Sequence, residues 1–225
     1  MSQWVTRGIG WGVVVFAFAG FGCASASEEP EDTAPPFRMS RAECANLLEI
    51  GTEGVTLESV DGPSEAQMGL DALNPEGADR SQYLLTFAVE QSFENQLERR
   101  MLIDEVNAQL KDPATGEAYH ATYDLDAPIE LSANELRTVT FYVTVPSDRW
   151  SADYLLGLTE GAAFGMTIAP VVRVTVPDSD NCGYPDGMLV QAKEGTVEVR
   201  RADDHRDAVV LGILSGILKA FAHGG

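Results

Sequence analysis

Alternating apolar and polar positions dominate most of the chain and predict β-strands. Every second residue of a strand faces the same side, so a period of two indicates a half-buried strand. The clearest case is 136–146, a β-branched and aromatic run with Phe141 on its inner face. Pro170 interrupts another alternating region and predicts an edge or a bulge there. The remaining predicted strands are 55–60, 83–89, 106–110, 118–123, 129–131, 164–168, 172–176, 188–190 and 196–199.

Turn signals between these strands predict their connections. Pro113 and Gly116 separate 106–110 from 118–123, so we expect these two strands to form a β-hairpin. The segment 61–80 is too long and too rich in Gly and Pro for a tight turn. It is therefore either a functional loop or the place of a short element around 68–73.

Helical periodicity is confined to three segments. The pattern in 38–50 is weakly helical, and 151–158 is compatible with a helical turn. The segment 208–222 is amphipathic, with its larger apolar residues at helical spacing and Gly212 and Gly216 on the opposite side. Three roles are open for this C-terminal helix: covering the strands, contacting a membrane or an envelope protein partner, or spanning a bilayer, for which it is short.

Many short strands with turn-rich connections are typical of an antiparallel sandwich. The predicted fold is mainly β, an antiparallel sandwich over 38–202 followed by a C-terminal amphipathic helix within 203–225. This pattern is similar to that of exported bacterial immunoglobulin-like or fibronectin-like modules, which implies an immunoglobulin-like sandwich. The Cys-Trp-Cys arrangement of antibody domains is absent from the sequence.

The N-terminal residues resemble an export signal. Residues 1–22 combine Arg7 with an apolar run, and Gly20-Phe21-Gly22-Cys23 resembles the lipobox of bacterial lipoproteins. The resemblance implies a diacylglyceryl group on Cys23 and attachment to a membrane, facing the periplasm or in the outer membrane. Residues 23–37 are acidic and rich in Pro, which predicts an extended tether. Cleavage after Ala24-Ser25-Ala26 is the alternative and would produce a secreted protein.

Charge and cysteine content narrow the function classes. The chain has 35 acidic and 15 basic residues, a formal net charge of -20, so we expect no nucleic-acid partner because phosphate is repelled. Of its three cysteines, a lipid-bearing Cys23 leaves Cys44 and Cys182 as an even pair in an oxidising compartment. We therefore predict a Cys44–Cys182 disulfide.

One loop has the composition of a calcium site. Asp178, Asp180 and Asp186 alternate with turn residues, as in the opening of a calcium loop, where several oxygens converge on a hard cation. The match is incomplete, because Cys182 stands at the fifth position and Leu189 at the twelfth. The favoured interpretation is a turn held by the disulfide, with calcium as a testable addition and no other cofactor expected.

No residue pattern indicates catalysis. His120, His205 and His223 have no triad or metal-ligand spacing, and no phosphate loop or nucleophile elbow is present. Trp150, followed closely by Tyr154, offers an aromatic platform for carbohydrate but is more typical of a core residue. The favoured hypothesis is a non-catalytic exported lipoprotein that binds a partner or serves a structural role in the cell envelope. The alternative is a secreted or periplasmic hydrolase whose site the sequence does not reveal.

Overall fold

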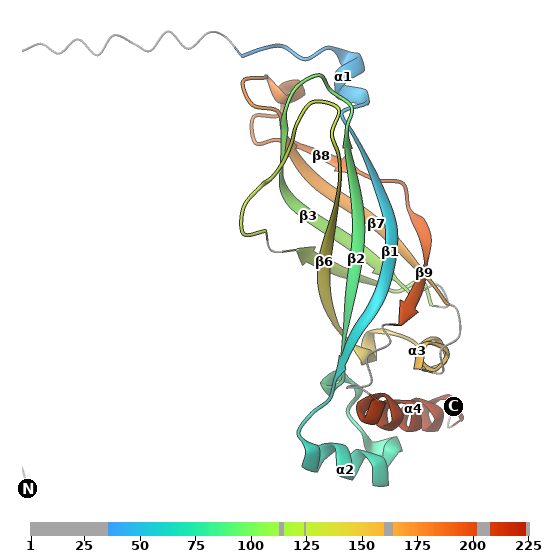
Figure 1. Cartoon of the computed structure of the whole chain (residues 1–225). Helices are drawn as coiled ribbons and strands as arrows, with labels where there is room; N and C mark the ends of the chain where they lie inside the picture. Colours follow the sequence, from blue (N-terminus) through green and yellow to red (C-terminus); the bar gives the residue numbers. More distant parts are fainter. Residues whose placement is uncertain (1–35, 113–114, 124, 160–163, 202–207, 224–225) are drawn as a thin grey trace, which may run out of the picture. The chain divides into compact units, whose positions relative to one another are not determined.

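Nine strands of the described residues form one mixed sheet that curls around a single core (Figure 1). The computed structural model describes residues 36–112, 115–123, 125–159, 164–201 and 208–223. The sheet order is β4-β3-β7-β9-β1-β2-β6, with β5 paired to β3 and β8 paired to β7. The strands are β1 Leu48–Asp61, β2 Leu84–Asn95, β3 Met101–Lys111, β4 Ala118–Tyr123, β5 Ile129–Leu131, β6 Leu136–Pro146, β7 Phe164–Thr175, β8 Met188–Gln191 and β9 Gly195–Arg201.

The two ends of this sheet approach each other. Tyr123 of β4 and Phe141 of β6 stack with ring centroids 4.5 Å apart, and Phe93 meets Phe141 edge-on at 6.2 Å. The result is a nearly closed barrel. The mainly β prediction is confirmed, but an immunoglobulin-like sandwich of two separate antiparallel sheets is not, because hydrogen bonds connect all the described strands into one sheet.

Most neighbouring strands are antiparallel, with one exception at the join between β9 and β1. There Val55–Leu57 runs parallel to Val199–Arg201 over three register pairs. The predicted hairpin is confirmed, because β3 and β4 pair antiparallel from Val106–Tyr123 to Lys111–Ala118. Several strands extend beyond the ranges that alternation predicted. Strand β1 begins at Leu48 and not at 55, and β3 begins at Met101 and not at 106.

Buried apolar side chains fill the inside of the barrel. Alternation places Phe87, Phe93, Ile103 and Leu110 there with almost no exposed surface, as the period of two requires. Burying each such side chain stabilises the fold by roughly 2–3 kcal/mol, because its apolar surface is removed from water. This burial is the main force that holds the curled sheet together.

Pro170 lies in the interior of β7, opposite Ala108 of β3, and not at an edge of the sheet. Its carbonyl accepts a hydrogen bond from Ala192 N (2.9 Å), a residue in the interruption between β8 and β9. The N–H and C=O of a strand residue point the same way, so the donor that Pro lacks would face this interruption. The β8–β9 segment is therefore interrupted opposite Pro170, where β7 has no N–H to donate.

The predicted helix over 38–50 is much shorter in the structure. Helix α1 covers only Arg41–Ala45 and β1 starts soon after it. Ser40 and Glu43 form a reciprocal capping box, and the strand pairing of β1 with β2 outweighs the weak helical pattern that follows. The segment 61–80 holds the short element that its length suggested, α2 Glu65–Leu73, followed by the 3-10 turns η1 Pro75–Gly77 and η2 Arg80–Gln82.

Helices close one end of the barrel. The predicted helical turn is α3 Ala152–Thr159, preceded by the 3-10 turn η3 Ser147–Arg149, and the C-terminal helix is α4 Ala208–His223. Helix α4 packs against α2 and α3 (Figure 1), and Leu214, Ile217 and Leu218 are fully buried. It belongs to the same compact unit as the strands. Among the described residues, no helix combines the length and the apolar character that crossing a bilayer requires.

Candidate ligand-binding groove

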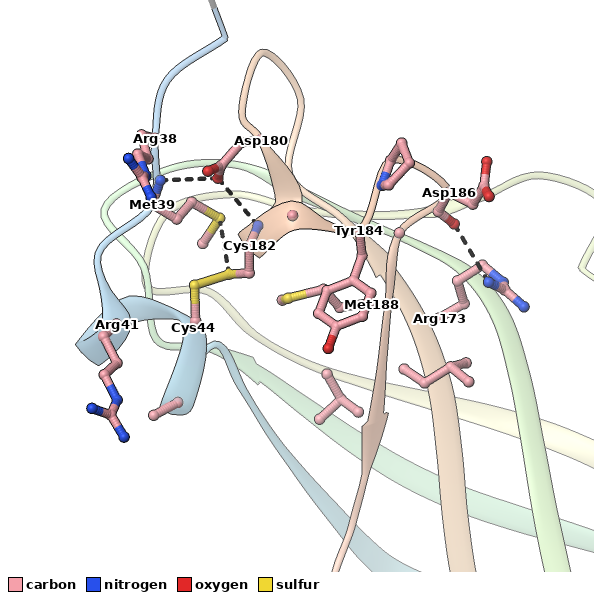
Figure 2. Close-up of a pocket in the computed structure, with 16 residues that line it drawn as sticks. Arg38, Met39, Arg41, Cys44, Arg173, Asp180, Cys182, Tyr184, Asp186 and Met188 are labelled. Carbon is pink, nitrogen blue, oxygen red and sulfur yellow. Dashed lines mark hydrogen bonds between the residues drawn. A yellow bond between two sulfur atoms is a disulfide. The ribbon is translucent and has the colours of Figure 1, made fainter.

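A disulfide joins Cys44 of α1 to Cys182, as predicted (Figure 2). It lies at the end of the barrel opposite to α2 and α4 (Figure 1). Cys182 lies in the 3-10 turn η4 Asn181–Gly183, and the Cα atoms of the two cysteines are 5.9 Å apart. The bond links residues 138 positions apart in the chain. It therefore holds the segment before β1 against the loop that follows β7.

This loop is built by polar contacts to its own backbone. Asn181 is buried, and its side-chain oxygen accepts a hydrogen bond from Val176 N at 2.7 Å. Asp178, Asn181 and Cys182 have positive φ, a conformation that Asp and Asn tolerate well. The predicted turn held by the disulfide is therefore what the structure contains.

The three aspartates of the predicted calcium site do not converge. Asp180 Oδ1 accepts hydrogen bonds from Met39 N (3.0 Å) and Cys182 N (3.1 Å), so it caps the turn and fixes the entering chain. Asp178 and Asp186 contribute backbone carbonyls, to Phe37 N (2.7 Å) and to Arg173 Nη1 (3.4 Å). Within the described part of the chain, no three His, Cys, Asp or Glu side chains are grouped to hold a metal ion.

Beside the disulfide lies an open hollow of about 1080 Å³, which we name the arginine groove. One wall is the segment of Arg38, Arg41 and Ala45, and the other is β8 with the turn before it (Figure 2). Met39, the disulfide and Met188 form an apolar floor. The remaining lining residues are Arg173, Asp180, Gly183, Tyr184, Pro185, Asp186, Gly187, Leu189 and Val190.

Gly187 sets the position of the second wall. Its φ is +87°, and a Cβ there would lie 2.9 Å from Thr175 Oγ1 and 3.0 Å from the carbonyl O of Val174. Only glycine combines this backbone conformation with so close an approach to β7. The chain can therefore turn sharply into β8, which leaves Leu189 64% exposed at the rim of the groove.

Three arginines and two aspartates, Asp180 and Asp186, line the groove of this strongly acidic protein. Arg38 and Arg41 are exposed and form no ion pair with any described carboxylate. Arg173 is already paired, because its Nε lies 3.1 Å from Glu105 Oε2. A hydrogen bond from Asn107, and then the one from Arg173, lower the pKa of Glu105, so this carboxylate stays charged. Two guanidinium groups therefore remain available to an anionic ligand.

An aromatic residue marks where the chain enters this region. Phe37 pairs with Ser179 in an isolated parallel bridge, and the guanidinium of Arg99 lies 3.9 Å from the centroid of the Phe37 ring. Such a cation–π contact fixes the ring at the surface. Tyr184, on the β8 side, is 61% exposed. Apolar and aromatic surface thus accompanies Arg38 and Arg41, which pair with no described carboxylate.

The structure places Trp150 and His120 outside the lining of this groove. Trp150 is buried and stacks on Tyr154 with ring centroids 5.3 Å apart, so it is a core residue and offers no open platform. His120 lies on β4 and faces solvent, opposite Gln109. Cys23 and His205 lie outside the described residues, as does the side chain of His223.

Sequence reasoning missed the arginine groove. Arg38 and Arg41 are the basic residues of a long acidic stretch, since no other Lys or Arg occurs between Gly8 and Asp79. That isolation was a usable signal. The partner wall could not be inferred, because it comes from a loop more than a hundred residues later, brought close by the disulfide.

Comparisons with known proteins give no family for this chain. No family model matches it, and no curated protein matches it. Similar solved structures include the ApaA protein from Bordetella pertussis, with 11% identity over 68% of this chain and 93% of that one and a TM-score of 0.37. A protein from Archaeoglobus fulgidus has 7% identity over 66% and 97% of the two chains, with a TM-score of 0.33. The lipoprotein ycdA from Bacillus subtilis has 12% identity over 72% of this chain and 38% of its own, with a TM-score of 0.31. Similarity this low establishes neither fold nor function.

Proposed function

We propose that this protein is a non-catalytic binding module of the bacterial cell envelope, exported and held to a membrane by a lipid on Cys23. Its ligand is anionic and binds in the arginine groove. The observation that carries the proposal is that Arg38 and Arg41, above an apolar floor, form no ion pair with any described carboxylate in a chain of net charge -20. Positive charge kept unneutralised on such a protein favours a ligand of opposite sign.

Two further features support export and tethering. The sequence Gly20-Phe21-Gly22-Cys23 resembles a lipobox, and the Cys44–Cys182 bridge is of the kind that persists in oxidising compartments. Phe37 pairs with Ser179 next to the groove, so a tether ending there would join the domain at its binding end. We also propose that the fold is immunoglobulin-like, with two layers of mostly antiparallel strands around one core. The support is that, among the described strands, only the β9–β1 pairing is parallel.

The tethering part is tested by intact mass spectrometry of the mature protein from membranes of a bacterial host that processes lipoproteins. We expect an N-terminal Cys23 with its acyl chains and a gain of two hydrogens on reduction. The Cys23→Ser variant should carry no lipid and should be lost from the membrane fraction. A mature chain that begins at Ser27 without lipid would overturn the tether and indicate secretion.

The binding part is tested with two anionic probes at low ionic strength, where exposed charges are least screened. One is a labelled short peptide of alternating Glu and Val, and the other is a vesicle of phosphatidylglycerol and phosphatidylcholine in equal parts. We expect Arg38→Gln/Arg41→Gln to weaken binding of the preferred probe about tenfold or more, as the loss of charge-assisted hydrogen bonds requires.

A matched control separates local recognition from net charge. Arg149→Gln/Arg200→Gln removes the same charge from two exposed positions outside the groove and should leave binding almost unchanged. Equal weakening by both pairs would mean that only the overall charge matters. That result, or binding unaffected by either pair, would reject the arginine groove as the ligand site.

A further inference from the structure

Strand β8 presents a free edge to the arginine groove. In the described residues β8 pairs with β7 alone, whereas β7 itself lies between β3 and the β8–β9 segment. Residues 187–190 line the groove directly (Figure 2). The backbone of β8 is therefore one wall of the hollow, with β7 behind it.

The register shows which backbone groups of β8 point away from β7. Ala192 N donates to the carbonyl O of Pro170, which continues the β7–β8 pairing by one residue. In an antiparallel ladder every second residue bonds to the partner strand, and the residues between point their N–H and C=O away. Counting back from Ala192, Val190 bonds to β7 while Leu189 and Gln191 point their N–H and C=O outward.

We infer that the arginine groove binds an extended acidic peptide segment of a protein partner, which adds as a strand to the free edge of β8. Strand addition supplies affinity through main-chain hydrogen bonds, and side chains of alternate residues supply specificity. Here the acidic side chains reach Arg38 and Arg41 on the opposite wall, and the apolar ones rest on Met39, the disulfide and Met188. This inference rests on the proposed function and names its ligand class.

The charge distribution favours β8 over β6, one of the other strands with a single neighbour among the described residues. Strand β6 ends the sheet order and is longer than β8. However, its Arg137 is already engaged with Glu135, at 2.7 Å between Nη2 and Oε1. An acidic strand would therefore meet an occupied guanidinium at β6, whereas at β8 it meets two that have no carboxylate partner among the described residues.

The peptide test uses the full mature chain and the alternating Glu-Val peptide, compared with the same peptide methylated on every backbone nitrogen. Methylation keeps all the carboxylates and removes all the main-chain donors. We expect binding to weaken about tenfold or more, because each main-chain hydrogen bond contributes to strand addition. This measurement needs no variant of the protein, so it is decisive even if an edge variant fails to fold.

The protein test removes one outward donor. Leu189→Pro deletes an N–H that points away from β7 and should weaken peptide binding about tenfold, while Leu189→Ala keeps the donor and should change binding less than about threefold. The matched control is Thr138→Pro on β6. Asn95 N donates to the carbonyl O of Glu135, and Ser147 N donates to the carbonyl O of Tyr83. The odd-numbered residues of β6 therefore bond to β2. Thr138 is even-numbered, so its N–H and C=O also point outward.

Each alternative outcome overturns the inference in a recognisable way. Equal binding of the methylated peptide rejects strand addition but leaves an arginine-dependent anion site, so the proposed function survives. Loss of binding in Thr138→Pro with none in Leu189→Pro moves the peptide to β6. Arginine-dependent binding of phosphatidylglycerol vesicles without peptide binding identifies lipid headgroups as the ligand. Absence of any arginine dependence removes the proposed function itself.

Discussion

The two ends of the barrel are held by different interactions. At the helical end, α4 covers the structure with Leu214, Ile217 and Leu218, and apolar packing does most of the work. At the other end, a five-residue helix, a capped loop and one disulfide hold the chain, and β8 keeps an open edge. A covalent bond stabilises a surface without covering it. The disulfide end can therefore stay stable and still expose backbone and charge to solvent.

Polar groups are also used differently at the two ends. At the helical end Tyr83 is buried and donates to Asp71 (2.8 Å), and burial together with this carboxylate raises the pKa of Tyr83. Its hydroxyl therefore acts as a structural donor and not as an acid. At the disulfide end Arg38 and Arg41 remain without carboxylate partners among the described residues. The buried Tyr83 hydroxyl is thus satisfied inside the protein, whereas these two exposed guanidinium groups have no described carboxylate to pair with.

The largest effect is expected from breaking the apolar end. Ile217→Asp places a charge in a fully buried position of α4, which should cost more than about 4 kcal/mol of unfolding free energy. Urea unfolding followed by circular dichroism measures the loss. Val209→Asp is the matched control, because Val209 is 70% exposed on the same helix and should change stability by less than about 0.5 kcal/mol. Similar losses in both would mean that α4 does not pack as described.

Removing the disulfide is expected to have the second largest effect. Cys44→Ala/Cys182→Ala releases a loop of 138 positions, and we expect a loss of about 3–5 kcal/mol, mainly through greater freedom of the unfolded chain. The measurement is unfolding with and without a reducing agent. Reduction should destabilise the native chain by the same amount and leave the variant unchanged. Insensitivity of the native chain to reduction would contradict this account of the disulfide end.

A moderate effect is expected from the arginine that joins the barrel to the helical end. Arg80 Nη2 donates to the carbonyl oxygens of Ser147 and Trp150, each at 2.6 Å, and burial lowers its pKa without removing its charge. Arg80→Met should cost about 2 kcal/mol, because hydrogen bonds to charged groups are stronger than neutral ones. Arg149→Met changes an exposed arginine nearby and serves as the control in the same thermal unfolding measurement. If Arg80→Met lost less stability than the control, the carbonyl groups of Ser147 and Trp150 would not depend on the Arg80 donor.

The smallest effect is expected at the capping box of α1. The Ser40 hydroxyl, and then the Ser40 N–H, lower the pKa of Glu43 from its ordinary value of 4.5. This stabilisation is present above pH 4.5 and is lost as the pH falls through the lower pKa of the folded state. Ser40→Ala should move the pKa of Glu43 back toward 4.5 and remove at most about 1 kcal/mol of cap energy. An NMR titration of the Glu43 carboxyl carbon decides this, and an unchanged pKa would contradict the capping box.

Short-range patterns explain which parts of the fold were predictable. The β6 segment and the β3–β4 hairpin depend on alternation and on turn residues a few positions apart, and both are present in the structure. The helical pattern of 38–50 failed beyond Ala45, because pairing with β2 decides the conformation of Leu48–Ile50. Local periodicity could not include that partner, which lies some forty residues later.

The sequence by itself determined the strand-rich character, the C-terminal amphipathic helix and the pairing of Cys44 with Cys182. These follow from periodicity and from the cysteine count once the lipobox resemblance sets Cys23 apart, and none of them needs knowledge of distant neighbours. Only the tertiary structure decided that the strands curl into one sheet, that Asp178, Asp180 and Asp186 do not converge, and that Arg38 and Arg41 line the same hollow as β8. The reason is physical: a groove is a relation between segments far apart in the chain, and strand order and register bring those segments together.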